Sequence, residues 1–334
     1  MSYVHLSNAD GWFTIPSRER QFERTSALVR RSSLILPVNV RRFVERAYTR
    51  GADAIVLDLE DSVPPREKPA ARELVPESIE LAGRGGADVM VRINKAFELA
   101  VSDLDAAIRP GLTGIVFPKV ESAVEVQIID RLIAEREMAR GLPVGEIEVA
   151  VLVETALGVQ HMAEIACASP RIVSISLGSE DFTKDIGVEP SADGEEQEYG
   201  KGMTVIAARL AGIQPQGLSS TLANFSDLEG LERSARRAAK IGFKGASCIH
   251  PTQVPVLNRA YSPDQEAVEY AYRVINVYEE TEAAGRASVS LDGKMIDIPI
   301  VDRARTLVAR AEAIAAREAR KQAALAAAGE DVRG

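Results

Sequence analysis

The chain of 334 residues contains only two cysteines and three histidines. Cys167 and Cys248 stand in small-residue, apolar contexts ("IACAS", "GASCIH"), which argues against a disulfide framework and is typical of a reducing cytoplasm. Neither a CxxC nor an HxxxH spacing occurs, so no zinc site is expected. No apolar run approaches the ~18 residues of a membrane span, and no secretory signal is recognisable. The sequence therefore predicts a soluble, cytoplasmic protein.

Long basic runs are also absent, and the net charge is −9. This balance argues against nucleic acid as a partner, although it leaves room for one basic pocket that binds an anionic ligand. The chain is 46% hydrophobic and 27% charged, which is typical of a globular protein with a large core. No GxGxxG follows the first apolar run, so a dinucleotide-binding fold loses its main support.

Short β-branched runs alternate with longer helical patterns along most of the chain. We expect strands at 33–38, 53–60, 88–94, 114–120, 148–155, 172–178, 213–219 and 245–250. We expect helices between them at 40–50, 66–82, 102–109, 122–140, 157–168, 197–211, 228–241 and 251–259. Most of the strands are continuously apolar, as parallel strands covered on both faces are. The pattern predicts an α/β fold, a (β/α)8 TIM barrel, with a doubly wound open sheet as the alternative.

Three regions follow from this pattern. Residues 1–27 form an N-terminal arm, residues 28–260 form the barrel, and residues 261–334 form a helical extension. The extension contains two long helical patterns joined by an extended link, and it is predicted to lie outside the barrel as a lid.

Charged residues follow several of the predicted strands. Arg92 ends the third strand, Glu154 ends the fifth and Asp181 follows the sixth. A single such residue often only begins a solvated loop, but several together are harder to explain that way. In a TIM barrel these positions meet at the carboxyl ends of the strands, where active sites lie.

Glu154 and Asp181 are predicted to lie on neighbouring strands, where two carboxylates repel and the pKa of one rises. A divalent cation removes this conflict, and Mg²⁺ commonly takes one or two carboxylates while keeping water ligands. Arg92 on a nearby strand could bind the carboxylate of a ligand or polarise its carbonyl. The three residues together suit the stabilisation of an enolate next to a bound carbonyl.

A set of motifs in fixed order resembles a known family. The segments include "GADAIVLDLEDSV", "VRIN", "PKVES", "VETALGV", "LGSEDFTKDIG", "GASCIHPTQV" and "LDGKMIDIP", between about residue 28 and residue 310. They resemble the citrate lyase β-subunit-like, or CoA-ester lyase, branch of the HpcH/HpaI aldolase superfamily, which includes malyl-CoA and citramalyl-CoA lyases. The resemblance implies a TIM barrel, Mg²⁺, cleavage of 3-hydroxyacyl thioesters, and homotrimers or homohexamers.

The resemblance also implies roles for individual residues. Glu154 and Asp181 correspond to the metal ligands, Glu154 also lying next to the substrate, and Arg92 corresponds to the arginine that binds the substrate carboxylate. Glu60 corresponds to a buried catalytic partner near Arg92, and Asp297 to a catalytic acid donated across a subunit interface. The remaining set corresponds to basic residues near the phosphates of CoA: Arg31, Lys68 and Arg72.

The sequence departs from the family at the mouth of the predicted barrel. The segment "PQGLSSTLANFSDLEGL" replaces the usual P-I-D-x-V-Y pattern, and Lys201 stands where an arginine is common. These departures leave the substrate open. The alternatives are an aldolase acting on free 2-keto or hydroxy acids, a malyl-CoA-type thioesterase using the same site, and a binding or regulatory protein with an inactive barrel. If the three basic residues do not converge on one rim, a CoA-dependent function loses support.

Overall fold

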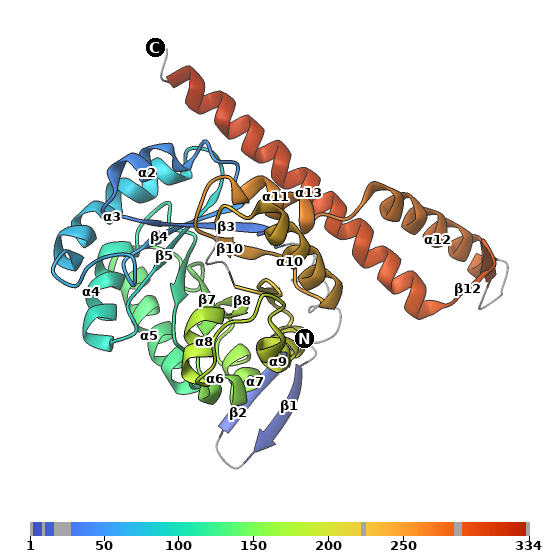
Figure 1. The fold of residues 1–334 in the computed structure, drawn as a ribbon, viewed down its shortest axis with the longest axis horizontal. Helices are drawn as coiled ribbons and strands as arrows, with labels where there is room; N and C mark the ends of the chain where they lie inside the picture. Colours follow the sequence, from blue (N-terminus) through green and yellow to red (C-terminus); the bar gives the residue numbers. More distant parts are fainter. Residues whose placement is uncertain (1–2, 9–10, 17–27, 222–224, 284–288, 332–334) are drawn as a thin grey trace.

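The computed structural model describes residues 3–8, 11–16, 28–221, 225–283 and 289–331. Its centre is a sheet of eight parallel strands, hydrogen bonded in the order β10-β3-β4-β5-β6-β7-β8-β9 (Figure 1). The strands are β3 (Ser32–Pro37), β4 (Ala54–Asp58), β5 (Asp88–Arg92), β6 (Gly114–Phe117), β7 (Glu148–Val153), β8 (Ile172–Leu177), β9 (Gln214–Gln216) and β10 (Ala246–Cys248).

Two backbone hydrogen bonds join the segments that carry the edge strands β9 and β10. Lys244 N donates to Pro215 O at 3.0 Å, and Gly217 N donates to Gly245 O at 2.9 Å. They bring the two edges together into a nearly closed barrel. The predicted (β/α)8 fold with C-terminal helices is therefore confirmed.

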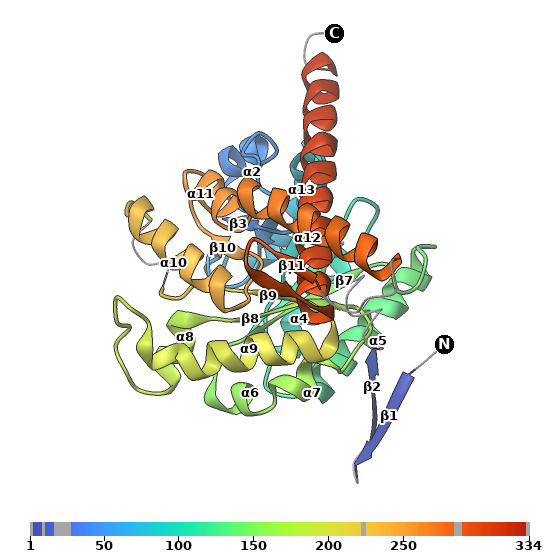
Figure 2. The same ribbon diagram turned by 90° about the vertical axis from the view of Figure 1, so that its right-hand side faces the viewer.

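Helices follow the strands and cover the outside of the barrel (Figures 1 and 2). They are α2 (Arg41–Ala47), α3 (Lys68–Gly83), α4 (Phe97–Ala107), α5 (Ala123–Ala139), α6 (Ala156–Gln160), α7 (Met162–Ala166), α8 (Ser179–Asp185), α9 (Glu198–Ala211), α10 (Leu228–Ile241) and α11 (Gln253–Ala260). The helix expected over 157–168 is divided at His161, and the short helix α8 was not expected.

The apolar strand residues explain why the sheet closes on itself. All five residues of β4 are buried, and Ile55, Leu57, Val91 and Ile115 have no exposed surface. Side chains of a barrel strand point alternately to the interior and to the helices, so a continuously apolar strand is buried only if both faces are covered. This requirement is met in a barrel with an outer ring of helices.

The N-terminal arm contains an antiparallel hairpin that the sequence did not predict. Strand β1 (Tyr3–Asn8) pairs with β2 (Gly11–Pro16), so that Tyr3 lies opposite Pro16 and Asn8 opposite Gly11. Figure 2 shows the hairpin projecting from the barrel.

The C-terminal extension consists of α12 (Gln265–Ala283), a hairpin of β11 (Val289–Leu291) and β12 (Lys294–Ile296), and the 34-residue helix α13 (Ile298–Asp331). The two helices share a small apolar cluster that includes Val274, Tyr278 and Val301. Figure 1 shows α12 and the start of α13 projecting beyond the barrel. Within the described ranges, no helix is long and apolar enough to cross a membrane.

The later part of α13 lies across the amino end of the barrel, where the strands begin. Arg317 Nη1 lies 2.7 Å from Asp88 Oδ1, and Lys321 Nζ lies 2.8 Å from Asp53 Oδ1. Lys321 also donates to Gly51 O at 2.9 Å. The extension thus contributes to the barrel itself, because these contacts seal its amino end.

Candidate active site

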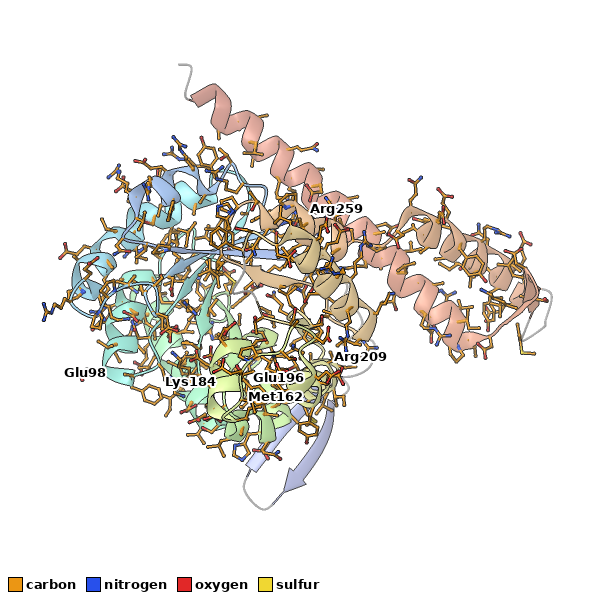
Figure 3. The ribbon with its side chains drawn as sticks, in the orientation of Figure 1. Glu98, Met162, Lys184, Glu196, Arg209 and Arg259 are labelled. Carbon is orange, nitrogen blue, oxygen red and sulfur yellow. The ribbon has the colours of Figure 1, made fainter. Side chains whose placement is uncertain are left out.

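A cavity of about 350 Å³ opens at the carboxyl ends of the strands. Its lining combines charged residues with apolar and neutral polar ones, among them Ile35, Asp61, Arg92, Leu152, Glu154, Ser176, Gly178, Asp181, Gln216, Leu218, Ser247 and Ile249. Figure 3 labels Lys184 on α8, the helix that follows the carboxyl end of β8 and whose first three residues line the cavity. The cavity therefore occupies the end of the barrel where TIM-barrel active sites lie.

Glu154 follows the last residue of β7 and is only 5% exposed. Burial raises its pKa, repulsion from Asp181 and Glu60 raises it further, and Lys119 only partly opposes this, so that the pKa is about 8. Gly178 makes room for this side chain, because a Cβ at that position would lie 2.6 Å from Glu154 Oε1. The site therefore holds a carboxylate that the surrounding chain does not neutralise.

Asp181 lies in the first turn of α8 and lines the same cavity as Glu154. Neither carboxylate forms an ion pair with an Arg or Lys in the described part of the chain. No group of three or more His, Cys, Asp or Glu side chains gathers as a metal site among the residues described. A pair of mutually repelling carboxylates beside a polar cavity nevertheless fits Mg²⁺, which takes few protein ligands and keeps several waters.

Arg92, the last residue of β5, points toward the same cavity and is held by a buried acid. Its Nε and Nη2 each donate to Asp58 at 2.7 Å. Burial opposes ionisation of Asp58, but the hydrogen bonds from Arg92 outweigh it and lower the pKa of Asp58. This bidentate pair fixes the plane of the guanidinium. Its third nitrogen, Nη1, lies 3.2 Å from Glu60 Oε2.

Glu60 is 5% exposed and lies between two cations. Lys119 Nζ is 2.5 Å from its Oε1, and Arg92 Nη1 approaches its Oε2 without making a hydrogen bond to it. Burial raises the pKa of Glu60, and the two cations oppose this. Glu60 is thus next to Arg92, as the family resemblance implied.

The three basic residues predicted to contact CoA do not converge. Arg31 precedes β3 and therefore lies at the amino end of the barrel, opposite the cavity. There it makes a bidentate contact to Asp53, donates to Ser262 at 3.0 Å and pairs with Glu318. The expectation that Arg31 shares one rim with the other two is corrected on this geometry, and a CoA-dependent function loses the support that convergence would have given.

Lys68 and Arg72 are on α3, on the side of the barrel where the cavity opens, but both serve nearby protein groups. Lys68 Nζ donates to Leu59 O at 2.9 Å, Glu60 O at 2.8 Å and Asn94 Oδ1 at 2.5 Å. These contacts use all three of its donors. Arg72 Nε donates to Asp103 at 2.7 Å, while its buried Nη2 has no partner in the part of the chain described. Their contact with CoA stays a prediction.

Asp297 lies away from the cavity of its own chain. It follows β12, which lies at the projecting end of the extension (Figure 1). Its main-chain and side-chain oxygens accept hydrogen bonds from the first turn of α13. It does not line the cavity. Within one chain, the structure brings together Arg92, Glu60, Glu154 and Asp181, but not Asp297.

Two residues that the sequence did not assign have clear positions in this site. Asp58 holds Arg92. Lys119 donates to Glu60 Oε1 through its ammonium and to Glu154 Oε2 through its backbone N–H. Both stand at the ends of strands, in "DLED" and "PKVES", and this position along the chain indicates the active-site end of the barrel. What the sequence did not indicate was the partner of each.

The comparison with family models decides the family. Residues 31–251 match the HpcH/HpaI aldolase/citrate lyase model. The chain belongs to this family. The resemblance predicted from the motifs is therefore confirmed, and the family match covers the barrel segment that carries Arg92, Glu154 and Asp181.

Relatives within the HpcH/HpaI family match along nearly their full length. Citrate lyase subunit beta of Leuconostoc mesenteroides subsp. cremoris is 35% identical over 85% of this chain and 94% of its own. L-malyl-CoA/beta-methylmalyl-CoA lyase of Cereibacter sphaeroides is 32% identical over 86% of this chain and 96% of its own. The crystal structure of CitE from Mycobacterium tuberculosis with magnesium, acetoacetate and coenzyme A has a TM-score of 0.67 and 29% identity, covering 86% of this chain and 99% of that one.

Proposed function

We propose that this protein is a Mg²⁺-dependent carbon–carbon lyase acting on a 3-hydroxy-dicarboxyl-CoA thioester such as malyl-CoA or citramalyl-CoA. The products are an acyl-CoA and glyoxylate or pyruvate. The observation that carries the proposal is the convergence of Glu154, Asp181 and Arg92 on one cavity of about 350 Å³. Membership of a family with lyase relatives, and CoA and magnesium bound together in a related structure, support it.

Three residues of the cavity, together with the neighbouring Glu60, have roles in binding the keto-acid half of the substrate. Glu154 and Asp181 hold Mg²⁺, which when bound supplies positive charge to the oxygens of the keto acid. Arg92 binds the carboxylate, because Asp58 fixes its plane and leaves Nη1 directed away from that pair. Glu60 lies beside that nitrogen and helps to hold the guanidinium in place.

The reaction also needs a group that exchanges a proton with the carbon next to the thioester. In condensation, a base takes a proton from that carbon, the carbanion forms a bond to the keto carbon, and the resulting alkoxide takes up a proton; cleavage is the reverse. We assign the base to Asp297 of a neighbouring subunit in a homotrimer or homohexamer. Its place at the projecting end of the extension, outside the cavity of its own chain, supports this assignment.

The direct test is incubation with Mg²⁺ and a panel of malyl-CoA, citramalyl-CoA and citryl-CoA, with keto-acid release and free thiol measured separately. Release of glyoxylate or pyruvate with the thioester of the acyl-CoA product intact is the expected result. Free thiol in proportion to substrate consumed would instead show a thioesterase. Activity on free hydroxy-keto acids, with none on any thioester, would contradict the CoA-dependent reaction and establish the CoA-independent aldolase.

The role of Asp297 is tested by mixing two inactive variants. Glu154→Ala and Asp297→Ala proteins are each expected to be inactive alone. If they are unfolded, refolded together and assayed, some sites will combine an intact cavity with an intact Asp297, and activity will return. The absence of any recovery, in mixtures shown to contain both chains in one oligomer, would contradict a site shared between subunits.

A further inference from the structure

Lys119 has an unusual backbone conformation directly after β6 and Pro118. Its φ angle is +54°, and among the residues described only Asp292, with φ of +50°, shares a positive φ without being glycine. Asp292 lies in the turn between β11 and β12, where an aspartate tolerates this conformation. A lysine gains no such local hydrogen bond, so its left-handed backbone is held by the surrounding structure.

This conformation directs the N–H of Lys119 at the proposed metal site. The N–H donates to Glu154 Oε2 at 2.8 Å, while the next residue, Val120, donates to Leu152 O at 3.0 Å and stays aligned with β7. The other oxygen, Glu154 Oε1, lies on the side of Gly178, which also lines the cavity. One oxygen of Glu154 is therefore fixed by the protein, and the rotation of the carboxylate is set.

The side chain of Lys119 runs to the other half of the site. Nζ lies 2.5 Å from Glu60 Oε1 and 3.2 Å from Asp61 Oδ1. The second oxygen of Glu60 is 3.2 Å from Arg92 Nη1, yet it lacks a hydrogen-bond partner among the residues described. Lys119 therefore links Glu154, a proposed metal ligand, with the acid next to the proposed carboxylate-binding arginine.

We propose that Lys119 is a positioning residue with two separable roles, and this inference rests on the function proposed above. Its backbone N–H orients Glu154 for Mg²⁺. Its ammonium holds Glu60 and keeps that carboxylate from turning fully onto Arg92 Nη1. Without the ammonium, Glu60 completes a hydrogen-bonded pair with Arg92 and competes with the carboxylate of the keto acid.

Three substitutions separate the two roles. Lys119→Gly removes the ammonium but retains the N–H, and glycine adopts a positive φ without strain. Lys119→Ala removes the ammonium but keeps the left-handed penalty of a residue with a Cβ. Because the contacts of the ammonium with Glu60 and Asp61 no longer help to hold that backbone, we expect the N–H to turn away from Glu154. Lys119→Arg keeps a cation at this position, and like lysine it must adopt a positive φ. Lys240→Ala, at an exposed position on α10, is the control for loss of a lysine charge.

Calorimetric titrations with MgCl₂, and with pyruvate at saturating Mg²⁺, measure the two roles independently of turnover. For Mg²⁺ we expect the Kd of Lys119→Gly within about twofold of the unsubstituted protein and that of Lys119→Ala raised about tenfold, the size of the left-handed penalty. For pyruvate we expect Kd raised about tenfold in both, because a competing buried ion pair forms, and restored to within about threefold in Lys119→Arg. Thermal melting identifies any variant that is not folded.

Two results would overturn the inference while the proposed function stands. Equal Mg²⁺ affinities for the folded Lys119→Ala and Lys119→Gly proteins would show that the backbone N–H does not orient Glu154. Unchanged pyruvate affinity in Lys119→Gly would show that the ammonium does not govern Arg92. If the unsubstituted protein bound no Mg²⁺ at all, the proposed function would fail, and this inference with it.

Discussion

At the amino end of the barrel, Asp53 is fully buried and accepts hydrogen bonds from Arg31 and Lys321. Burial acts to raise its pKa, but these two cations outweigh it and lower the pKa to about 2. At the carboxyl end, Glu154 is almost as deeply buried, yet burial and neighbouring acids raise its pKa to about 8. The same kind of group is neutralised by the protein at one end and left uncompensated at the other.

This difference separates stability from function. Charges that are paired inside the chain are already satisfied and hold α13 against the barrel. Charges that the chain does not balance are costly to bury unless something else neutralises them. We propose that Mg²⁺ supplies the balancing positive charge at the carboxyl end. Substitutions at the two ends should therefore have opposite effects on stability and activity.

The largest expected effect on stability is at the amino end. Asp53→Ala removes the fully buried carboxylate that Arg31 and Lys321 share and leaves them only the more exposed Glu318, so it should lower the free energy of unfolding by about 3 kcal/mol. Urea denaturation measures this, with the exposed Asp302→Ala in α13 as the control. The stabilisation is present above about pH 4 and is lost as the pH falls toward 2, because the folded pKa lies below the unfolded one. A folded stability equal to that of the control would show that this ion network is not structural.

The next largest effect is on activity at the carboxyl end. Glu154→Ala should lower kcat/KM by at least about a hundredfold, since residues that only support metal ligands already cost ten- to a hundredfold. Its thermal stability without metal should not fall, because the substitution removes a buried and repelled carboxylate. Glu164→Ala, an exposed glutamate of α7, is the matched control for activity and melting. A Glu154→Ala protein that is destabilised but still active would contradict the claim that this carboxylate serves activity and not stability.

A smaller, graded effect is expected from pH. In the metal-free protein Glu154 titrates near pH 8, so below that pH Mg²⁺ must displace one proton. Mg²⁺ affinity should rise by up to about tenfold per pH unit toward pH 8 and then level off.

The free energy of unfolding of the metal-free protein should change in the opposite direction over the same pH range. Between about pH 4.5 and 8 the folded chain holds the extra proton, so the contribution of Glu154 to stability falls as the pH rises. Calorimetric Mg²⁺ titrations at pH 6, 7, 8 and 9 measure the first effect, and a pH-independent affinity would contradict it.

The barrel and much of its site followed from the sequence because both depend on a simple geometric rule. Continuously apolar strands alternating with helices specify the barrel, and the residues after such strands meet at one end. For this reason the sequence predicts that Arg92, Glu154 and Asp181 meet at one end of the barrel, and in the structure they line one cavity. The same rule also explains why Arg31 lies elsewhere. It precedes its strand, which places it at the amino end, whereas its assignment to CoA came only from the resemblance.

Other features depend on tertiary contacts that no local pattern encodes. Nothing in "GIVFPKV" indicates that Lys119 has a left-handed backbone, because lysine has no preference for it. The docking of α13 likewise depends on Arg317 and Lys321 meeting acids that are more than 200 positions away along the chain. Periodicity predicts that such a helix exists, but not the surface against which it packs.

The most direct test of the account is a calorimetric titration of the metal-free protein with MgCl₂ at pH 8. We predict one Mg²⁺ ion per chain, with binding lost in both Glu154→Ala and Asp181→Ala and retained in Glu164→Ala. Saturable binding that survives either of the first two substitutions, or no binding by the unsubstituted protein, would contradict the claim that these two uncompensated acids form the metal site.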